Sequence, residues 1–155
     1  MTIRPALVAD IPLLQSLAHK IWHSCYPGII TPEQIEFMLA WMYSERKIRE
    51  EIDAGVAWEI VEDDGRSIGF LAYELEPDHR VKLHKLYLLP EEQGRGHSPK
   101  LLAHVFDRAR ALGGGEVWLQ VNKGNSRAVG AYRKAGFHIA REAVFEIPDG
   151  RHRQE

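Results

Sequence analysis

The sequence predicts an α/β (α+β) fold in which one mixed, mostly antiparallel sheet has helices on both faces. Strand-like and helix-like patterns of apolar residues follow one another along the chain. Asp63-Asp64-Gly65 separates two strand-like segments, which is a strong signal for a hairpin. The 155 residues suffice for one domain with a substantial core and are too few for two ordinary domains, so we expect a single domain over residues 1–155.

The first third of the chain predicts a short strand followed by three helices. Residues 2–5 have a strand pattern, and Pro12 opens a helical pattern that ends near Ser24. Thr31-Pro32-Glu33-Gln34 combines an N-cap, a proline in the first turn and a capping-box glutamine. A second helix is therefore expected to begin there and to reach about residue 43, and a charged third helix is expected over 44–54.

The rest of the chain predicts strands that are joined by turns and helices. The expected strands are 56–61, 67–76, 81–89, 116–121 and 137–147, and the expected helices are 99–112 and 125–135. Pro99 is interpreted as the start of the first of these helices, because proline is well suited to a first helical position.

The composition limits the classes of function that the protein can have. Hydrophobic residues make up 45% and charged residues 27% of the chain, as in soluble globular proteins, and the apolar runs are far shorter than the roughly 18 residues of a membrane helix. Cys25 is the sole cysteine, so neither an internal disulfide nor a thiol metal cluster is expected, and the cytoplasm is the expected compartment. A formal net charge of −2 gives no case for nucleic-acid binding. We expect no metal and no membrane partner.

The segment around Gly94 and Gly96 predicts an anion site. Both glycines lie between a strand pattern and an amphipathic helix pattern. Glycine adopts positive φ at little cost, so successive backbone N–H groups can converge on one anion at the positive end of the following helix. A ligand that carries phosphate is therefore one interpretation, and an ordinary glycine turn is the other.

A second motif follows about thirty residues later. In order and spacing, the two motifs resemble the signatures of the GNAT superfamily of acyl-CoA N-acyltransferases. The matching residues are Gln93, Gly96 and, imperfectly, Ser98 in the first motif, and Asn125, Ala128, Tyr132, Gly136 and Phe137 in the second. Members of this superfamily usually finish with another strand, whereas residues 151–155 are charged and have no strand pattern. The final strand is therefore expected to be missing, and a second copy of the chain could cover the exposed edge as a homodimer.

The resemblance implies acetyl-CoA as the cosubstrate. The expected cofactor-binding residues are Leu86, Tyr87 and Leu88 for the pantetheine arm, Gln93, Gly94, Arg95, Gly96, His97 and Ser98 for the pyrophosphate, and Asn125 for the arm or an ordered water. Backbone donors near Leu86 to Leu88 could also polarise the thioester carbonyl. Ser98 replaces the usual Gly or Ala, and Pro99 lacks an amide donor that relatives can offer to phosphate.

The resemblance also assigns catalytic roles. Tyr132 stands at the general-acid position, where its phenol would protonate the leaving thiolate, although a tyrosine that packs its ring on the sheet is the alternative. Glu74 and His84 are the candidates for the base. The competing interpretations are that Glu74 lies on a solvated surface and that His84 has a structural role. Gln120 stands where some relatives have Glu, and it cannot usefully accept a proton, which disfavours a protein N-terminus as acceptor.

The predicted reaction is transfer of an acyl group, in the first place acetyl, from acyl-CoA to a primary amine by direct attack in a ternary complex. The expected acceptor is a small molecule, and a protein lysine or N-terminus is the alternative acceptor. Two non-enzyme alternatives are a non-catalytic acyl-CoA-binding sensor or interaction module and a scaffold that has lost CoA binding. Aromatic residues of the first two helices could line the acceptor pocket or simply form core. These residues are Trp22, His23, Tyr26, Trp41 and Tyr43.

Overall fold

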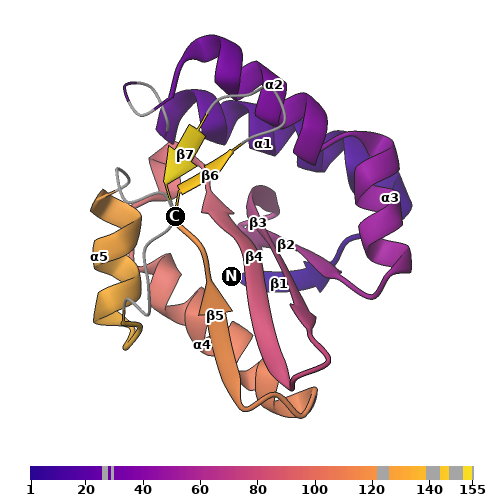
Figure 1. The fold of residues 1–155 in the computed structure, drawn as a ribbon, viewed down its shortest axis with the longest axis vertical. Coiled ribbons are helices and arrows are strands. Elements are labelled where there is room, and N and C mark those ends of the chain that lie inside the picture. Colours follow the sequence, from indigo (N-terminus) through magenta and orange to yellow (C-terminus); the bar gives the residue numbers. More distant parts are fainter. Residues whose placement is uncertain (26–27, 29, 122–125, 139–143, 147–151, 155) are drawn as a thin grey trace. The chain divides into compact units, whose positions relative to one another are not determined.

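A computed structural model describes residues 1–155 apart from 26–27, 29, 122–125, 139–143, 147–151 and 155 (Figure 1). The chain forms two compact units, Met1–Trp118 and Leu119–Glu155. The first unit holds β1 (Thr2–Pro5), α1 (Ile11–Cys25), α2 (Pro32–Met42), α3 (Glu45–Asp53), β2 (Ala57–Asp63), β3 (Arg66–Leu75), β4 (Arg80–Leu88) and α4 (His97–Ala111), with short 3-10 helices at Val8–Asp10 and Pro90–Glu92. β5 (Glu116–Leu119) spans the boundary.

Five strands form one sheet in the order β1-β2-β3-β4-β5, and the first three pairings are antiparallel. The direction of β5 follows from its neighbours on β4. The N–H of Gly115 donates to the carbonyl of His79 at 2.9 Å, and Lys82 Nζ lies 4.8 Å from the centre of the Trp118 ring. Residue numbers therefore rise in the same direction along both segments, so β5 runs parallel to β4. The sheet is therefore mixed and mostly antiparallel, as predicted.

Local signals in the sequence form the expected turns and caps. Thr31 Oγ1 accepts a hydrogen bond from the N–H of Gln34, whose side-chain oxygen accepts one from the N–H of Thr31, so the predicted capping box at the start of α2 is confirmed. In the β2–β3 hairpin, Asp64 and Gly65 have φ of 51° and 74°. Two positive φ values are what a type I′ turn needs, and this turn matches the twist of the strands.

Helices cover both faces of the sheet, as two adjacent residues of β2 demonstrate. Trp58 Nε1 donates to Glu51 of α3 at 3.0 Å, whereas Glu59 accepts a hydrogen bond of 2.8 Å from His104 of α4. Because neighbouring side chains of a strand point to opposite faces, α3 and α4 lie over opposite faces. The predicted arrangement of helices is confirmed.

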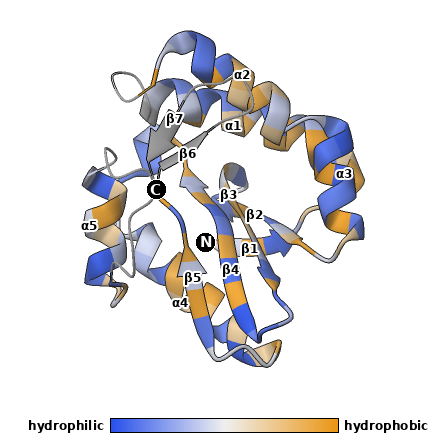
Figure 2. Cartoon of the chain, in the orientation of Figure 1, coloured by the Kyte–Doolittle hydropathy of each residue, from blue (hydrophilic) through white to orange (hydrophobic). Residues whose placement is uncertain are grey.

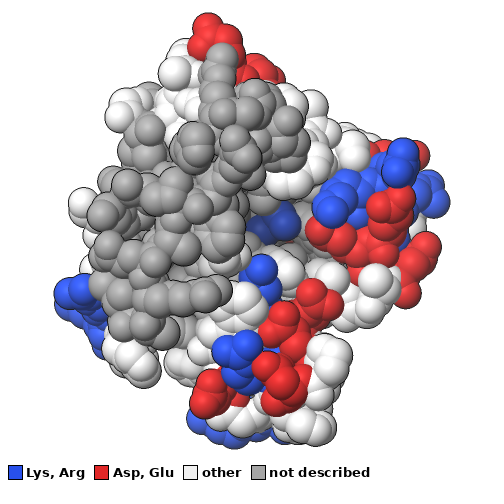
Figure 3. Space-filling view, in the orientation of Figure 1, with Lys and Arg blue, Asp and Glu red and all other residues white. Residues whose placement is uncertain are grey.

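The core of the first unit lies between these helices and the sheet. Hydrophobic and hydrophilic residues alternate along β4 in Figure 2, while residues 68–73 of β3 are buried without interruption, since both faces of this central strand are covered. On the outer surface α3 carries both signs of charge, paired one turn apart in Arg46–Glu50 and Arg49–Glu45 (Figure 3). Among the described residues, no helix is long and apolar enough to cross a bilayer.

The second unit holds α5 (Ser126–Lys134), β6 (Val144–Glu146) and β7 (His152–Gln154). The prediction of a missing final strand is wrong, because β7 pairs antiparallel with β6. The charged residues of β7 do not alternate between apolar and polar, so the sequence pattern gave no sign of a strand. The strand forms because its backbone pairs with that of β6. The argument for a homodimer from an uncovered edge loses its basis. Phe137 is not the start of a strand either, since its N–H donates to the carbonyl of Tyr132 and so belongs to the end of α5.

Candidate active site

The chain turns sharply between β4 and α4. Gly94 and Gly96 have φ of 78° and 84°, a region that side chains disfavour. Gly96 is the N-cap of the 15-residue helix α4, and it offers no side chain to cap the first N–H groups. A Cβ atom added at Gly96 would meet no atom within 4 Å, so the space beside the turn is open. The predicted geometry of an anion site, two positive-φ glycines before a helix, is therefore present.

Helix α4 begins at His97, two residues before the predicted start, so Pro99 is its third residue and not its first. Proline fits this position because the N–H groups of the first turn have no partner inside the helix. Because Pro99 has no N–H, the backbone donors at the N-terminus of α4 are those of Gly96, His97 and Ser98. These three donors, with the positive end of the helix dipole, are the chemistry that a phosphate oxygen needs.

The buried side chain of Glu92 stabilises the turn through hydrogen bonds. Its side chain is only 4% exposed, and its carboxylate accepts hydrogen bonds from Arg66 at 2.6 Å, His97 at 3.1 Å and Arg95 at 3.4 Å. The side chains of Arg95 and His97 therefore hold the turn in place, while its backbone N–H groups stay available. Sequence reasoning missed Glu92, because a glutamate before a glycine turn gives no local signal of burial.

The predicted pantetheine edge lies in the second half of β4. Leu86, Tyr87 and Leu88 pair with β3 on one side, and Gln93 Nε2 donates to the carbonyl of Leu88 at 3.1 Å. On the other side, β5 starts beside the first residues of β4 and is only four residues long. Since parallel strands advance at the same rise per residue, β5 ends before it reaches Leu86.

Glu74 and His84, two separate candidates for the base, are hydrogen-bonded to each other. His84 is the extra residue of a bulge in β4, between Leu83 opposite Tyr73 and Lys85 opposite Ala72. Its Nε2 lies 2.7 Å from Oε1 of Glu74, and both side chains are half-buried.

The surroundings of His84 favour its neutral form. Burial lowers the pKa of the His84 imidazole below its ordinary value of 6.5, and the charges of Lys82 and Lys85 act in the same direction. The hydrogen bond to Glu74 opposes this shift but does not reverse it. A neutral imidazole beside a carboxylate can accept a proton near pH 7, which is the protonation state that a general base needs.

Tyr132 lies in α5, in the second unit. Its side chain is half-buried, and its ring meets that of Phe137 edge-on, with 5.7 Å between the ring centres. Gly136 ends the helix with a φ of 105°, as predicted for a glycine just past a helix end. The second motif thus forms one local structure. Asn125 lies outside the described residues.

The aromatic residues of the first two helices divide between core and surface. Trp22 and Tyr43 are buried, and Trp22 Nε1 donates to the hydroxyl of Tyr43 at 3.3 Å. Trp41 is exposed, and Tyr26 lies outside the described residues. The interpretation as core is confirmed for Trp22 and Tyr43.

The sequence model of the acetyltransferase (GNAT) family matches residues 17–137. This chain belongs to the acetyltransferase (GNAT) family. An uncharacterized N-acetyltransferase of Mycobacterium tuberculosis is 33% identical over 141 residues, which are 90% of each protein. The spermidine N(1)-acetyltransferase of Thermoplasma acidophilum is 28% identical over 142 residues, which are 88% of each protein.

Solved GNAT structures agree with this assignment. The PaiA N-acetyltransferase of Thermoplasma acidophilum, solved in complex with coenzyme A, matches with a TM-score of 0.81 and 25% identity over 99% of this chain and 96% of that one. The ribosomal-protein-S18-alanine N-acetyltransferase of Escherichia coli shares the fold with a TM-score of 0.73 at 20% identity, over 99% and 88% of the two chains. The GNAT chain described here is thus an acyl-CoA-dependent acetyltransferase, and the predicted fold, family and enzyme class are confirmed.

Proposed function

We propose that the protein transfers an acetyl group from acetyl-CoA to a primary amine of a small molecule, by direct attack while both substrates are bound. Two relatives with named acceptors support a small amine. One is the spermidine N(1)-acetyltransferase of Thermoplasma acidophilum. The other is the L-methionine sulfoximine/L-methionine sulfone acetyltransferase of Pseudomonas aeruginosa, 25% identical over 150 residues, which are 90% of this chain and 81% of that protein.

The turn at Gly94–Gly96 carries the proposal. Acetyl-CoA supplies an activated thioester and a pyrophosphate, and the pyrophosphate fits the N–H groups of Gly96, His97 and Ser98 at the start of α4. Gly94 and Arg95 complete the turn, whose shape the buried carboxylate of Glu92 maintains. The backbone of Leu86 to Leu88 is assigned to the pantetheine arm, and Asn125 keeps its role from the family motif.

In this proposal His84 acts as the base. An amine attacks only in its neutral form, so a proton must leave the ammonium of the acceptor. The imidazole of His84, neutral because burial lowers its pKa, takes that proton directly or through one water. Glu74 orients the ring through its 2.7 Å hydrogen bond and stabilises the imidazolium that forms.

Tyr132 acts as the general acid. The leaving group of the reaction is a thiolate, and a phenol can protonate it because the two groups have similar ordinary pKa values. The ring of Tyr132 packs edge-on against that of Phe137, which restricts the motion of the side chain. A cytoplasmic location and a homodimer stay predictions.

Titration calorimetry with acetyl-CoA, free CoA and adenosine diphosphate tests the cosubstrate first. We expect micromolar binding of acetyl-CoA and weaker binding of adenosine diphosphate, because the diphosphate engages the turn alone. Release of free thiol from acetyl-CoA is then measured with spermidine, methionine sulfone and an amine-free control. Turnover with a small amine supports the proposal, and binding without turnover of any amine, including a lysine peptide, supports a non-catalytic sensor.

A protein acceptor is the second candidate. The N-alpha-acetyltransferase RimI of Mycobacterium tuberculosis is 38% identical over 61 residues, which are 39% of this chain. Incubation with a cell extract and labelled acetyl-CoA, followed by peptide mapping, separates the two candidates. If the label is found on peptides and not on small amines, the small-molecule proposal is overturned.

A further inference from the structure

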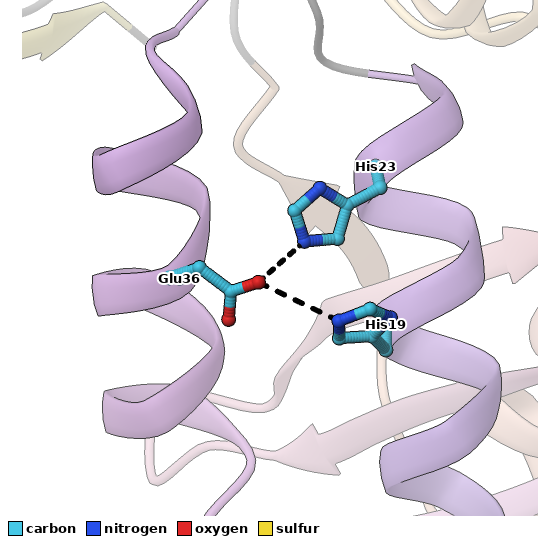
Figure 4. A group of neighbouring side chains, drawn as sticks. All are labelled: His19, His23 and Glu36. Atoms are coloured by element: carbon cyan, nitrogen blue, oxygen red, sulfur yellow. Dashed lines mark hydrogen bonds and ion pairs between the residues drawn. The ribbon is translucent and has the colours of Figure 1, made fainter.

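Two histidines and a glutamate meet between α1 and α2 (Figure 4). His19 and His23 lie one turn apart on α1, and Glu36 reaches toward them from α2. Oε1 of Glu36 lies 2.7 Å from Nε2 of His23 and 3.5 Å from Nε2 of His19. The two imidazole rings are 4.5 Å apart, measured between their centres.

The helices explain why these side chains converge. Residues four apart in a helix project from the same face, so His19 and His23 form a pair that faces α2. In Figure 4 both rings point toward the carboxylate of Glu36. The side chains of His19 and Glu36 are 61% and 59% exposed, and that of His23 is 33% exposed. An ion can therefore reach the three ligand atoms from solvent.

We propose that His19, His23 and Glu36 bind a divalent transition-metal ion of the zinc type. Zinc takes imidazole nitrogen and carboxylate oxygen at about 2.0–2.2 Å, so ligand atoms of a tetrahedral site lie about 3.3 Å apart. The three atoms already lie within 4.8 Å of one another, and the distance from His19 to Glu36 is close to the required value. Only a small outward rotation of the exposed Glu36 is needed at His23. Water would fill the fourth position.

The cluster offers more ligand atoms than one ion pair uses. Oε1 of Glu36 pairs with Nε2 of His23 at 2.7 Å, and Nε2 of His19 lies 3.5 Å from the same oxygen. A metal ion would bond to both rings and to the carboxylate at once. Nitrogen ligands also select zinc, copper or nickel over calcium and magnesium, which prefer oxygen.

A second group of ligand atoms, in Asp63, Glu92 and His97, fits a metal less well. Arg66 and Arg95 already neutralise the carboxylate of Glu92, and the N-terminal ammonium lies 3.2 Å from Asp63. A cation would have to displace these positive groups. The ion pairs of the cluster between α1 and α2 join His19 and His23 to Glu36 and involve no Lys or Arg, so this cluster is the better site among the described residues.

Titration of the chelator-treated protein with zinc chloride, followed by calorimetry without acetyl-CoA, tests the site. We expect one equivalent to bind at micromolar concentration and His19→Gln, His23→Gln and Glu36→Gln each to weaken binding at least tenfold. His138→Gln, at an exposed histidine outside the cluster, and Asp63→Asn, in the other group, are the matched controls and should leave the affinity unchanged. Calcium chloride and magnesium chloride should not bind.

Cobalt chloride gives a second readout. Tetrahedral Co²⁺ absorbs visible light strongly, so an absorption band should appear with the wild-type protein and vanish in His23→Gln. Circular dichroism confirms that each variant folds. Unchanged zinc affinity in all three cluster variants, or no binding by the folded wild-type protein, would overturn the proposal. Neither result bears on acetyl transfer, because the measurement contains no acetyl-CoA.

Discussion

Nζ of Lys85 lies 4.9 Å from the centre of the Trp58 ring and 5.5 Å from that of Tyr43, in the core of the first unit. Lys85 is 5% exposed, and among the described residues no carboxylate is within ion-pair distance of it. Burial lowers the pKa of its ammonium below the ordinary 10.5. The charge of Glu51 opposes this shift, and two aromatic faces lie beside the ammonium, so the cost of desolvation is offset only in part.

We expect Lys85→Met to raise the free energy of unfolding at pH 7 by about 1–2 kcal/mol, because it keeps the volume and removes the buried charge. Because the folded pKa lies below the unfolded value, the cost of the ammonium disappears as pH rises through the folded pKa toward 10.5. The advantage of methionine should shrink accordingly. Urea unfolding at pH 7 and pH 10 measures both effects. A less stable Lys85→Met at pH 7 would mean that the rings stabilise the ammonium.

Gly96→Ala should weaken acetyl-CoA binding at least tenfold and lower the free energy of unfolding by about 1–2 kcal/mol, because alanine disfavours a φ of 84°. Gly115→Ala is the matched control, since its φ is not positive and its new Cβ would meet no atom within 4 Å. Calorimetry and thermal unfolding are the measurements. Equal acetyl-CoA affinity in the two variants would contradict the role of the turn.

Tyr132→Phe should lower kcat by about 10²-fold or more and leave the affinity for acetyl-CoA unchanged. Phenylalanine keeps the edge-on contact with Phe137, so packing in α5 is retained and only the proton donor is lost. Steady-state kinetics with the best amine from the screen, together with calorimetry, check this result. A loss of acetyl-CoA binding that matches the loss of turnover would assign Tyr132 to binding instead.

The acid limb of kcat/KM should lie below pH 6.5, since burial lowers the pKa of His84. Glu74→Gln should move this limb to still lower pH, because the Glu74 carboxylate raises the pKa of its partner. In His84→Gln the limb should disappear together with most of the turnover. Rates across pH 5–8 in these three proteins are the measurement. An unmoved limb in Glu74→Gln would exclude His84 as the titrating base.

Glu92→Gln should lower the free energy of unfolding by about 1–3 kcal/mol, because a buried amide cannot match the charge of Arg66, Arg95 and His97. Acetyl-CoA binding should weaken as well, since the turn loses its anchor. Glu91→Gln, at the exposed neighbour, is the control and should change neither quantity measurably. Urea unfolding and calorimetry distinguish the two variants.

Local chemistry explains which features could be predicted. The capping box at Thr31 and the Asp64-Gly65 turn depend on residues within three or four positions, so their structures follow directly from the sequence. The family motifs likewise predicted the acetyltransferase class, which the comparisons confirm. Helix α4 starts earlier than its proline suggested, because Pro99 is tolerated anywhere in the first turn.

Contacts between distant segments were beyond such reasoning. The sequence by itself determined the order of strands and helices, the glycine turn and the family, because periodicity and turn chemistry are local properties. Only the tertiary structure decided that His84 meets Glu74, that Glu92 is buried beneath the turn and that Glu36 faces two histidines. It also formed β7 from a charged segment, since strand pairing depends on a partner backbone more than on the apolar pattern of one strand.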